Sequence, residues 1–403
     1  MVFRSISILG AAAPLLVSAT LAFASDRGDS TWVEPDPAAD LWDFYIFPAM
    51  SFSPSSDGPA TGSAVAIITA GAQPDLGIQY RINFDTDPSD DEVAGISEDA
   101  AFEIWWQSDP SNGKRCINVA FGDETFSNCG VSGTVLPDDS IQFTADWGQD
   151  EISVFSGWRG ASAWGSGEGM QTAFGLLKAK AAECAITDCD YLEWATYDTA
   201  WSEVEIEDGS AGDEFSGDAQ FAVVIEFPVS ALPNEFSTWG ASYRHAGFIR
   251  TPEGDLNRGP WVQMDRAAAP WVWLLLDSAT TRNLYNRGPV DESSFRSAIL
   301  GAVTAIRADA EGSLLIFNDG TVETPHAIPS VDEVVSYFHP DVLRVTLDGT
   351  FGSFPNGRNL GTDITDEFLS LLIGQPTVDD YERPLCLPEP GFPYLTDTVC
   401  EIE

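Results

Sequence analysis

The side chains whose spacing could do chemistry are carboxylates, and the first set lies in the stretch DPAADLWDFYIF. Asp36, Asp40 and Asp43 stand four and three residues apart in it, directly before a run of aromatic residues. These steps do not suit one face of an alternating strand, because the first is even and the second is odd. We interpret the trio as a turn leading into a strand, with ligand or ion binding as the alternative.

The stretch DTDPSDDE has the pattern closest to a metal site. Calcium takes about six to eight oxygen ligands, and carboxylates at alternating positions of a tight loop can converge on one ion. Pro88 favours a turn within the stretch, although the glycine of a helix-loop-helix calcium site is missing. A solvated hairpin tip is the alternative. The candidate calcium ligands are Asp85, Asp87, Asp90 and Asp91.

The stretch FPNGRNLGTDITDEF combines amide, guanidinium and carboxylate groups. Asn356 and Gly357 form a turn dipeptide. Asp363 and Asp366 fall in the first turn of a predicted helix, where free N–H groups favour carboxylates. Arg358 could pair with either carboxylate. A structural role therefore accounts for these residues, and a ligand site is the alternative.

The N-terminus has the features of a secretory signal peptide. Arg4 precedes a long apolar stretch, and Ala22-Phe23-Ala24 fits the small-x-small cleavage pattern. We therefore predict that residues 1–24 are removed and that the mature region 25–403 is secreted, in a periplasmic or extracellular location. No second long apolar run follows, so no membrane span is expected in the mature chain.

The charge balance narrows the classes of partner. With 63 acidic and 19 basic residues, the chain has a formal net charge of −44. Such a surface repels nucleic acid and anionic lipid, so neither is expected as a partner. A saline environment explains the charge without a specific acidic function. The content of 44% hydrophobic residues is enough for a large folded core and argues against disorder.

Cysteines occur in an even number, which in an exported chain predicts disulfide bonds. The six cysteines allow about 15 pairings, but they fall as three pairs that are close in the sequence. A zinc site is disfavoured because no C-x-x-C pair occurs. The predicted bonds are Cys116–Cys129, Cys184–Cys189 and Cys386–Cys400.

Strand patterns dominate the first two-thirds of the mature chain. Apolar and polar residues alternate in LGIQYRINFD as expected of a half-buried strand. Similar segments follow, separated by Gly, Pro, Asp and Ser. We predict a mainly β fold, with antiparallel sheets in a β-sandwich or jelly-roll-like arrangement. The predicted strands cover residues 76–85, 101–108, 115–122, 140–148, 151–158, 219–229 and 237–245.

A few peripheral helices are predicted, and they make the last third of the chain more helical. Apolar residues recur at helical spacing in four segments, at 170–184, 295–306, 331–338 and 364–372. Ser330 and Glu333 form a capping box before the third segment. Because one core would be unusually large, we expect two packed sub-domains that divide near residue 290.

The stretch QMDRAAAPWVWLLLD is predicted to contain a buried strand. In residues 271–276 both alternating sets of side chains are apolar, which is typical of a strand covered on both faces. The alternative is a carbohydrate site that uses exposed Trp271 and Trp273. The core interpretation is favoured.

Several stretches together resemble the DUF4331 family of bacterial proteins. DPAADLWDFYIF is similar to that family's D-P-x-A-D-x-x-D-x-Y-x-F opening, and VQMDRAAAP to its V-Q-x-D-R-x-x-x-P stretch. PDVLRVTLDG, FPNGRNLGTDITD and FPYL resemble its later blocks. The matches keep the family's order across nearly all of residues 25–403. The resemblance implies an exported protein of a family without an established activity.

No enzyme signature accompanies these segments. The sequence lacks the G-x-S-x-G, H-E-x-x-H and G-x-x-x-x-G-K-[ST] motifs, and it has only three histidines. The leading hypothesis is a non-enzymatic binding or structural protein of the cell envelope or extracellular space. Its partner would be a glycan or another envelope component, and Ca²⁺ is the candidate stabilising ion. The alternative is a carboxylate-based hydrolase of an extracellular polysaccharide, which would need a cleft with two convergent carboxylates.

Overall fold

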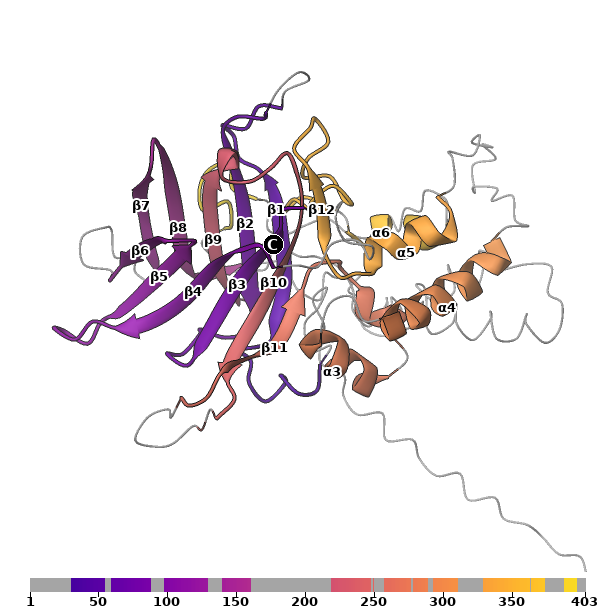
Figure 1. The fold of residues 1–403 in the computed structure, drawn as a ribbon, viewed down its shortest axis with the longest axis horizontal. Coiled ribbons are helices and arrows are strands. Elements are labelled where there is room, and N and C mark those ends of the chain that lie inside the picture. Colours follow the sequence, from indigo (N-terminus) through magenta and orange to yellow (C-terminus); the bar gives the residue numbers. More distant parts are fainter. Residues whose placement is uncertain are drawn as a thin grey trace, which may run out of the picture.

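The computed structural model shows two antiparallel sheets that face each other, with helices beside them (Figure 1). The mainly β prediction, with a few helices concentrated in the last third, is confirmed. The structure describes residues 30–54, 59–87, 98–129, 140–160, 219–247, 249, 257–276, 278–288, 293–310, 329–362, 364–373 and 388–396.

The five-stranded sheet has the order β1-β2-β9-β8-β7. Its strands are β1 (Leu41–Pro48), β2 (Ser63–Ala70), β9 (Ala219–Pro228), β8 (Asp150–Gly160) and β7 (Ile141–Trp147). The first three are buried along nearly their whole length. Burial on both faces explains why SAVAIITA in β2 lacks the alternation of a half-buried strand.

The second sheet contains seven strands, and β10 pairs with three of them. In order these are β11 (Trp261–Ala267), β10 (Glu235–His245), β3 (Ile78–Asp85), β4 (Ala100–Ser108), β5 (Arg115–Phe121) and β6 (Glu124–Asn128), with β12 (Leu343–Thr346) also paired to β10. β3 pairs along one edge of β10. The other edge is divided between β12, at Glu235–Thr238, and β11, at Gly240–His245.

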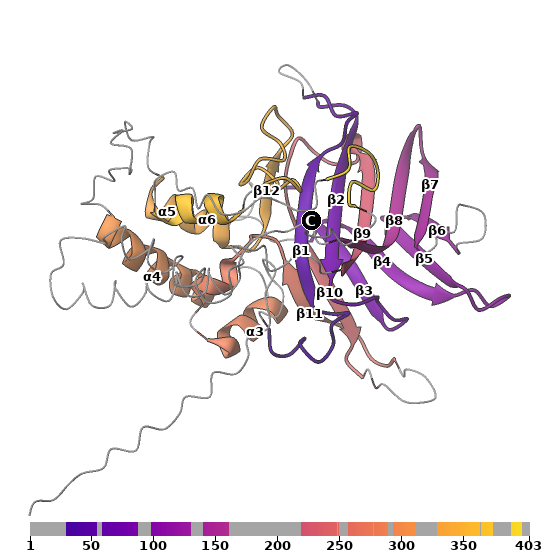
Figure 2. The same ribbon diagram turned by 180° about the vertical axis from the view of Figure 1, so that it is seen from behind.

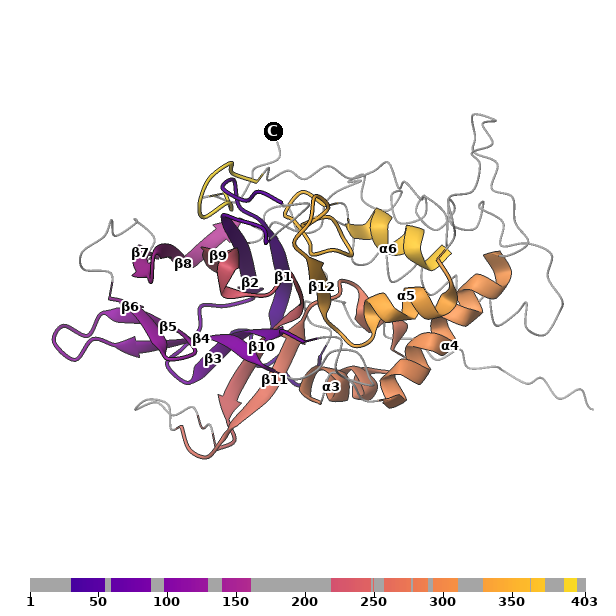
Figure 3. The same cartoon turned by 45° about the horizontal axis from the view of Figure 1, so that its top comes forward.

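Aromatic side chains fill the space between the two layers, which Figure 3 shows nearly edge-on. The ring of Phe84 lies 5.7 Å from Phe102 in its own sheet and 6.0 Å from Phe227 in the opposite sheet. The sheets approach each other closely at Gly240, where an added Cβ would lie 3.2 Å from Phe44 and Ile68. The strand predictions of the first two-thirds therefore describe the two layers of one sandwich.

The helices lie at one end of the sandwich and share its core (Figure 1). They are α3 (Ala279–Arg287), α4 (Ser293–Ala310), α5 (Val331–Phe338) and α6 (Ile364–Ile373), with the short 3-10 turns η1 (Val229–Ala231) and η2 (Val272–Leu275). The capping box of Ser330 and Glu333 is present. α3 was not predicted, and the helix predicted over 170–184 lies outside the described residues. The main hydrophobic cluster includes residues on both sides of position 290, and a division there stays a prediction.

Residues 271–276 correct one prediction of the sequence. They are buried, as expected, but they form a 3-10 turn instead of a strand. Trp271 has a left-handed backbone with φ of 59° where the chain leaves β11 for the helices. An apolar run without polar residues cannot distinguish a strand from a buried turn, which explains the error.

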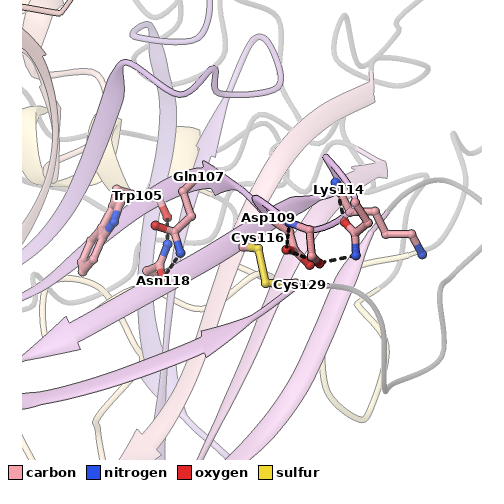
Figure 4. The surroundings of a disulfide bond; sticks show 9 residues. Trp105, Gln107, Asp109, Lys114, Cys116, Asn118 and Cys129 are labelled. Carbon is pink, nitrogen blue, oxygen red and sulfur yellow. Dashed lines mark hydrogen bonds between the residues drawn. A yellow bond between two sulfur atoms is a disulfide. The ribbon is translucent and has the colours of Figure 1, made fainter.

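One predicted disulfide is present, between Cys116 of β5 and Cys129 directly after β6 (Figure 4). Beside it, Asp109 closes the β4–β5 turn by accepting hydrogen bonds from Ser111 and Asn112, and these bonds lower the pKa of its carboxyl. The bonds predicted for Cys184, Cys189, Cys386 and Cys400 lie outside the described residues.

No helix in the described part is long and apolar enough to cross a membrane.

Candidate functional site

The three aspartates of DPAADLWD do not converge on one point, because each has a different partner. Arg244 donates to both oxygens of Asp36, at 2.9 and 2.8 Å. Asp40 accepts a hydrogen bond from the indole of Trp42 at 3.3 Å. Asp43 is fully buried and pairs with Arg358. Asp36 and Asp43 therefore connect the start of β1 to β10 and to the segment of Arg358, whereas the described bond of Asp40 is local.

The Asp43–Arg358 pair joins two of the acidic stretches singled out in the sequence. Arg358 Nη1 lies 2.9 Å from Asp43 Oδ1, and both side chains are nearly inaccessible to solvent. The guanidinium also lies over the ring of Tyr45, 4.3 Å from its centroid. Backbone hydrogen bonds between Ile46 and Arg358 add the residue to the open edge of β1. A buried pair of this kind orders the edge of the sheet.

The other candidate residues of FPNGRNLGTDITD are Asn356, Asp363 and Asp366, and the structure describes the side-chain contacts of Asn356 only. The Asn356 amide pairs with the backbone N–H and C=O of Thr346, at 2.7 and 3.0 Å. Asp366 belongs to the first turn of α6, as predicted, but its side chain is not described. Asp363 lies outside the described residues. The predicted ligand site is therefore tested only at Asn356 and Arg358, whose contacts hold the fold.

A second buried ion pair, unforeseen in the sequence, joins β11 to the segment between α5 and β12. Arg266 Nε lies 3.7 Å from Asp341 Oδ2, and its guanidinium covers the ring of Tyr285. Asp341 Oδ1 accepts a hydrogen bond from Ala269 N at 2.9 Å. Burial raises the pKa of Asp341 to about 6, although Arg266 and Ala269 act in the opposite direction. The carboxyl therefore titrates above its usual range.

The candidate calcium ligands are only partly described. Asp85 is buried at the end of β3, where its Oδ1 accepts a hydrogen bond from Asp87 N at 3.1 Å, and Asp87 is exposed. Asp90 and Asp91 lie outside the described residues. Among the described histidines, cysteines and carboxylates, no group of three or more is arranged to hold a metal ion. The calcium site stays a prediction.

An open hollow at one end of the five-stranded sheet is the candidate binding site, with a volume of about 730 Å³. Three segments form its wall: the β1–β2 connection, the β7–β8 hairpin turn and the end of β9 with η1. Its described lining residues are Ser51, Ala60, Thr61, Gly62, Ser63, Asp146, Gly148, Gln149, Asp150, Glu151, Ser153, Glu226, Pro228, Val229 and Ser230.

The polar side chains that line this acidic hollow present mainly carboxylate and hydroxyl oxygen atoms. Four carboxylates line it, at positions 146, 150, 151 and 226, together with five Ser or Thr hydroxyls. None of its described lining residues is basic or aromatic. Because negative charge concentrates cations in a partly enclosed site, the hollow favours a positively charged ligand.

Backbone constraints shape the wall of the hollow. Gly62 has φ of +88°, and a Cβ at this position would lie 2.0 Å from the carbonyl oxygen of Ser51. The Ser51 hydroxyl accepts a hydrogen bond from Ser63 N at 3.1 Å. On the opposite side, Ser230 donates to Asp150 Oδ2 at 3.3 Å. Glycine is therefore required where the β1–β2 connection turns into the hollow.

Glu226 connects the hollow to the C-terminal part of the chain. Tyr394 donates its phenolic hydrogen to Glu226 Oε2 at 2.7 Å. Burial, together with this bond, raises the pKa of Tyr394, so the phenol stays a donor. One residue that lines the hollow, Glu226, is thus hydrogen-bonded to a segment near the C-terminus.

Sequence reasoning missed the hollow and the Arg266–Asp341 pair. The acids of DWGQDE flank a two-residue hairpin turn, which was the available local signal. Among 63 acidic residues, however, that signal does not separate a binding residue from a solvated one. Comparison of the chain with protein-family models, curated proteins and solved structures gives no match.

Proposed function

We propose that this chain is a non-enzymatic, exported binding protein whose acidic hollow takes a small cationic ligand. The observation that carries this proposal is the hollow itself, which presents four carboxylates and five hydroxyls and has no basic group among its described lining residues. A metal ion such as Ca²⁺ and an organic amine share the required charge. The strongly negative chain as a whole strengthens the same preference.

The contacts of the motif segments support a binding role over a catalytic one. The charged side chains that the sequence made prominent, Asp36, Asp43 and Arg358, engage one another or neighbouring elements inside the fold. A general acid–base pair needs two groups that face a shared substrate position. These three residues instead face partners that stabilise the sandwich.

Membership of the DUF4331 family is proposed on the order of the matching segments. Those segments also meet in space, which supports treating them as one set. Asp43 pairs with Arg358 of the FPNGR stretch, and the ring of Phe47 lies 5.6 Å from Tyr394 of FPYL. Asp265 of the VQMDR stretch accepts a hydrogen bond from Leu41 N at 2.9 Å.

Calorimetric titration tests the proposed ligand class. The purified mature protein is titrated with CaCl₂, with spermidine and with a neutral oligosaccharide. Saturable binding of either cation is expected, and the double variant Asp150→Asn/Glu151→Gln should weaken it at least about tenfold. The matched control is Asp123→Asn/Glu124→Gln, which removes two exposed charges from the β5–β6 turn. Equal binding by both double variants would contradict the proposal.

A polysaccharide hydrolase is the second candidate, and one observation favours it. Glu226 and Asp150 line the same hollow, and they have different hydrogen-bond donors in Tyr394 and Ser230. Unequal surroundings are what a general acid and its partner carboxylate require. Release of reducing sugar from a polysaccharide panel, lost in Glu226→Gln, would favour this alternative over binding alone.

A further inference from the structure

Buried polar side chains lie on the face of β3 that is turned away from the core between the sheets. Ile82 and Phe84 of this strand belong to that core. Asn83 and Asp85 alternate with them and therefore point to the opposite face. Both are fully buried. Because burial removes polar groups from water, such side chains need partners inside the protein.

Ser237 of β10 belongs to the same group. It lies opposite Asp85 in the ladder between β10 and β3, two strands that run side by side in the second sheet (Figure 2). Its other edge pairs with Arg344 of β12, whose guanidinium donates to the carbonyl of Ser336. Ser237 is 1% exposed. We call Asn83, Asp85 and Ser237 the β3–β10 cluster.

Two members of the β3–β10 cluster have buried polar atoms to which no described residue is hydrogen-bonded. These atoms are the amide oxygen and nitrogen of Asn83 and the hydroxyl of Ser237. Thr238 donates its hydroxyl hydrogen to Asn83 at 2.8 Å, but the acceptor is the backbone carbonyl. Buried polar groups in folded proteins nearly always have a partner, because an unpaired group has lost its water for nothing. The cluster therefore has the capacity to bind a ligand.

The strand register brings the three side chains close enough to share that ligand. Directly opposite residues such as Asp85 and Ser237 have Cβ atoms about 4.5–5.5 Å apart, and diagonal neighbours such as Asn83 and Ser237 about 7–8 Å. Asn83 and Asp85, two residues apart in one strand, are separated by roughly 6.4–6.8 Å. A metal ion placed between them is within reach of one oxygen from each side chain.

The types of side chain decide the class of ion. A carboxylate, an amide carbonyl and a hydroxyl are all oxygen ligands, and the cluster contains no nitrogen or sulfur ligand of the kind that zinc prefers. Calcium accepts oxygen ligands in an irregular arrangement, at about 2.3–2.6 Å, and it also takes backbone carbonyls and water. Magnesium requires near-ideal octahedral geometry and gives up its water reluctantly. The cluster therefore favours calcium.

The charges at the end of β3 favour a cation as well. Asp85 Oδ1 accepts a hydrogen bond from Asp87 N at 3.1 Å, so the exposed carboxylate of Asp87 follows directly in the chain. Asp99 lies beside the same strand end, where its Oδ2 accepts a hydrogen bond from Thr86 N at 2.9 Å. Together these acids produce a negative potential that attracts positive ions.

We propose that Asn83, Asp85 and Ser237 bind Ca²⁺ and that the ion joins β3 to β10. None of the three lines the acidic hollow, so this site is independent of the proposed function. It contains one carboxylate, which agrees with the finding that the described His, Cys, Asp and Glu side chains form no metal-binding group of three. With so few charged ligands, the expected dissociation constant is about 10⁻⁴–10⁻³ M, as in extracellular calcium modules.

Terbium luminescence tests the site, because Tb³⁺ occupies calcium sites and emits when a nearby tryptophan is excited. Trp239 lies opposite Asn83 in the ladder and is the sensitiser. The purified mature protein should give saturable terbium emission that Ca²⁺ reverses. Trp239→Phe should lower this emission severalfold, whereas the rise in melting temperature with calcium should persist.

Two substitutions remove single ligands from the cluster. Asn83→Leu and Ser237→Ala should each weaken calcium binding at least about tenfold. Without calcium, both variants should melt close to the wild-type temperature, because they remove polar atoms to which no described residue is bonded. The matched control is Thr69→Val in β2, which removes another fully buried hydroxyl without a described partner and should leave calcium binding unchanged.

The outcomes separate this site from the hollow. No saturable emission, or equal calcium affinity in Ser237→Ala and Thr69→Val, would overturn the proposal. Emission that survives both cluster variants but disappears in Asp150→Asn/Glu151→Gln would also overturn it, because the terbium would then lie in the hollow. Emission that depends on the cluster and survives this double variant supports the site, whatever the hollow binds. If Asn83→Leu loses its near-ultraviolet circular dichroism, Ser237→Ala decides.

Discussion

Carboxylates serve in two contrasting regions of this molecule. Around β1 and β11, Asp43 and Asp341 are buried and face Arg358 and Arg266. Around the acidic hollow, Asp146, Asp150 and Glu151 are exposed, and no basic residue is among the described lining residues. A buried carboxylate influences stability because its desolvation must be compensated, whereas an exposed one influences mainly the local potential. Identical residue types thus have different roles.

The largest effect is expected where the Asp43–Arg358 pair is broken. Arg358→Met removes the cation that faces a fully buried carboxylate, and the free energy of unfolding should fall by about 3–5 kcal/mol. Urea unfolding measures the change. The control is Arg296→Met, which disrupts the exposed pair with Asp332 and should cost less than about 1 kcal/mol. Equal losses in the two variants would remove the distinction between buried and exposed pairs.

The pH dependence of the free energy of unfolding tests the buried carboxyl of Asp341. The folded pKa of Asp341, about 6, lies above its ordinary value of 3.8. The folded state therefore binds a proton more tightly than the unfolded state, and this group stabilises the fold increasingly as pH falls from 6 towards 4. Over that interval, the free energy of unfolding of the wild-type protein should rise by up to about 3 kcal/mol relative to that of Asp341→Asn.

Asp348 provides a control with the opposite sign. Hydrogen bonds from Thr350 lower the pKa of its carboxyl below 3.8. The stability that it contributes is present above pH 3.8 and is lost as pH falls through the folded pKa. The free energy of unfolding of the wild type, measured relative to that of Asp348→Asn, should thus decline at low pH. Parallel curves for the two aspartates would contradict the assigned role of burial.

A smaller effect is expected at the wall of the hollow. Gly62→Ala forces a side chain into a left-handed position against the Ser51 carbonyl, which should cost about 1–3 kcal/mol and weaken cation binding. Gly113→Ala is the matched control, because φ is also positive there but the added Cβ meets open space. Thermal unfolding and calorimetric titration measure both effects. A similar loss in both variants would attribute the cost to φ alone.

The smallest effect on stability is expected from the hollow's own charges. Asp150→Asn/Glu151→Gln should change the free energy of unfolding by no more than about 0.5 kcal/mol, since both side chains are exposed. The same variant should lose cation binding in the titration described above. A large loss of stability would mean that these acids stabilise the fold as the buried carboxylates do, and it would contradict the distinction between the two regions.

Local patterns in the sequence predicted most of the elements. Alternation located β3, helical spacing located α4, and helical spacing with a capping box located α5. Several elements were missed, among them α3, β6 and β12, and two of the errors have a clear physical cause. β2 was missed because burial on both faces removes the alternation that marks a half-buried strand. Residues 271–276 were assigned to a strand because an all-apolar run has no period to read.

The candidate sites were harder to predict than the elements, because they depend on long-range pairing. Asp36, Asp40 and Asp43 were interpreted as an entry to the first strand, and their partners include Arg244 and Arg358, far along the chain. No spacing rule links Asp43 to Arg358. The hollow likewise combines three separate segments, and none of them indicates a binding site when considered alone. A tertiary structure was needed to choose among them.

The division of one edge of β10 between β11 and β12 has a consequence for folding order. The sheet is incomplete until residues 343–346 reach β10, and the first strand is incomplete until Arg358 bonds to it, 314 residues after Phe44. Contacts between such distant parts of a chain form slowly, because a large loop must close before they contribute. A chain that emerges N-terminus first therefore leaves β10 and β1 with open edges until residues 343–358 have been made.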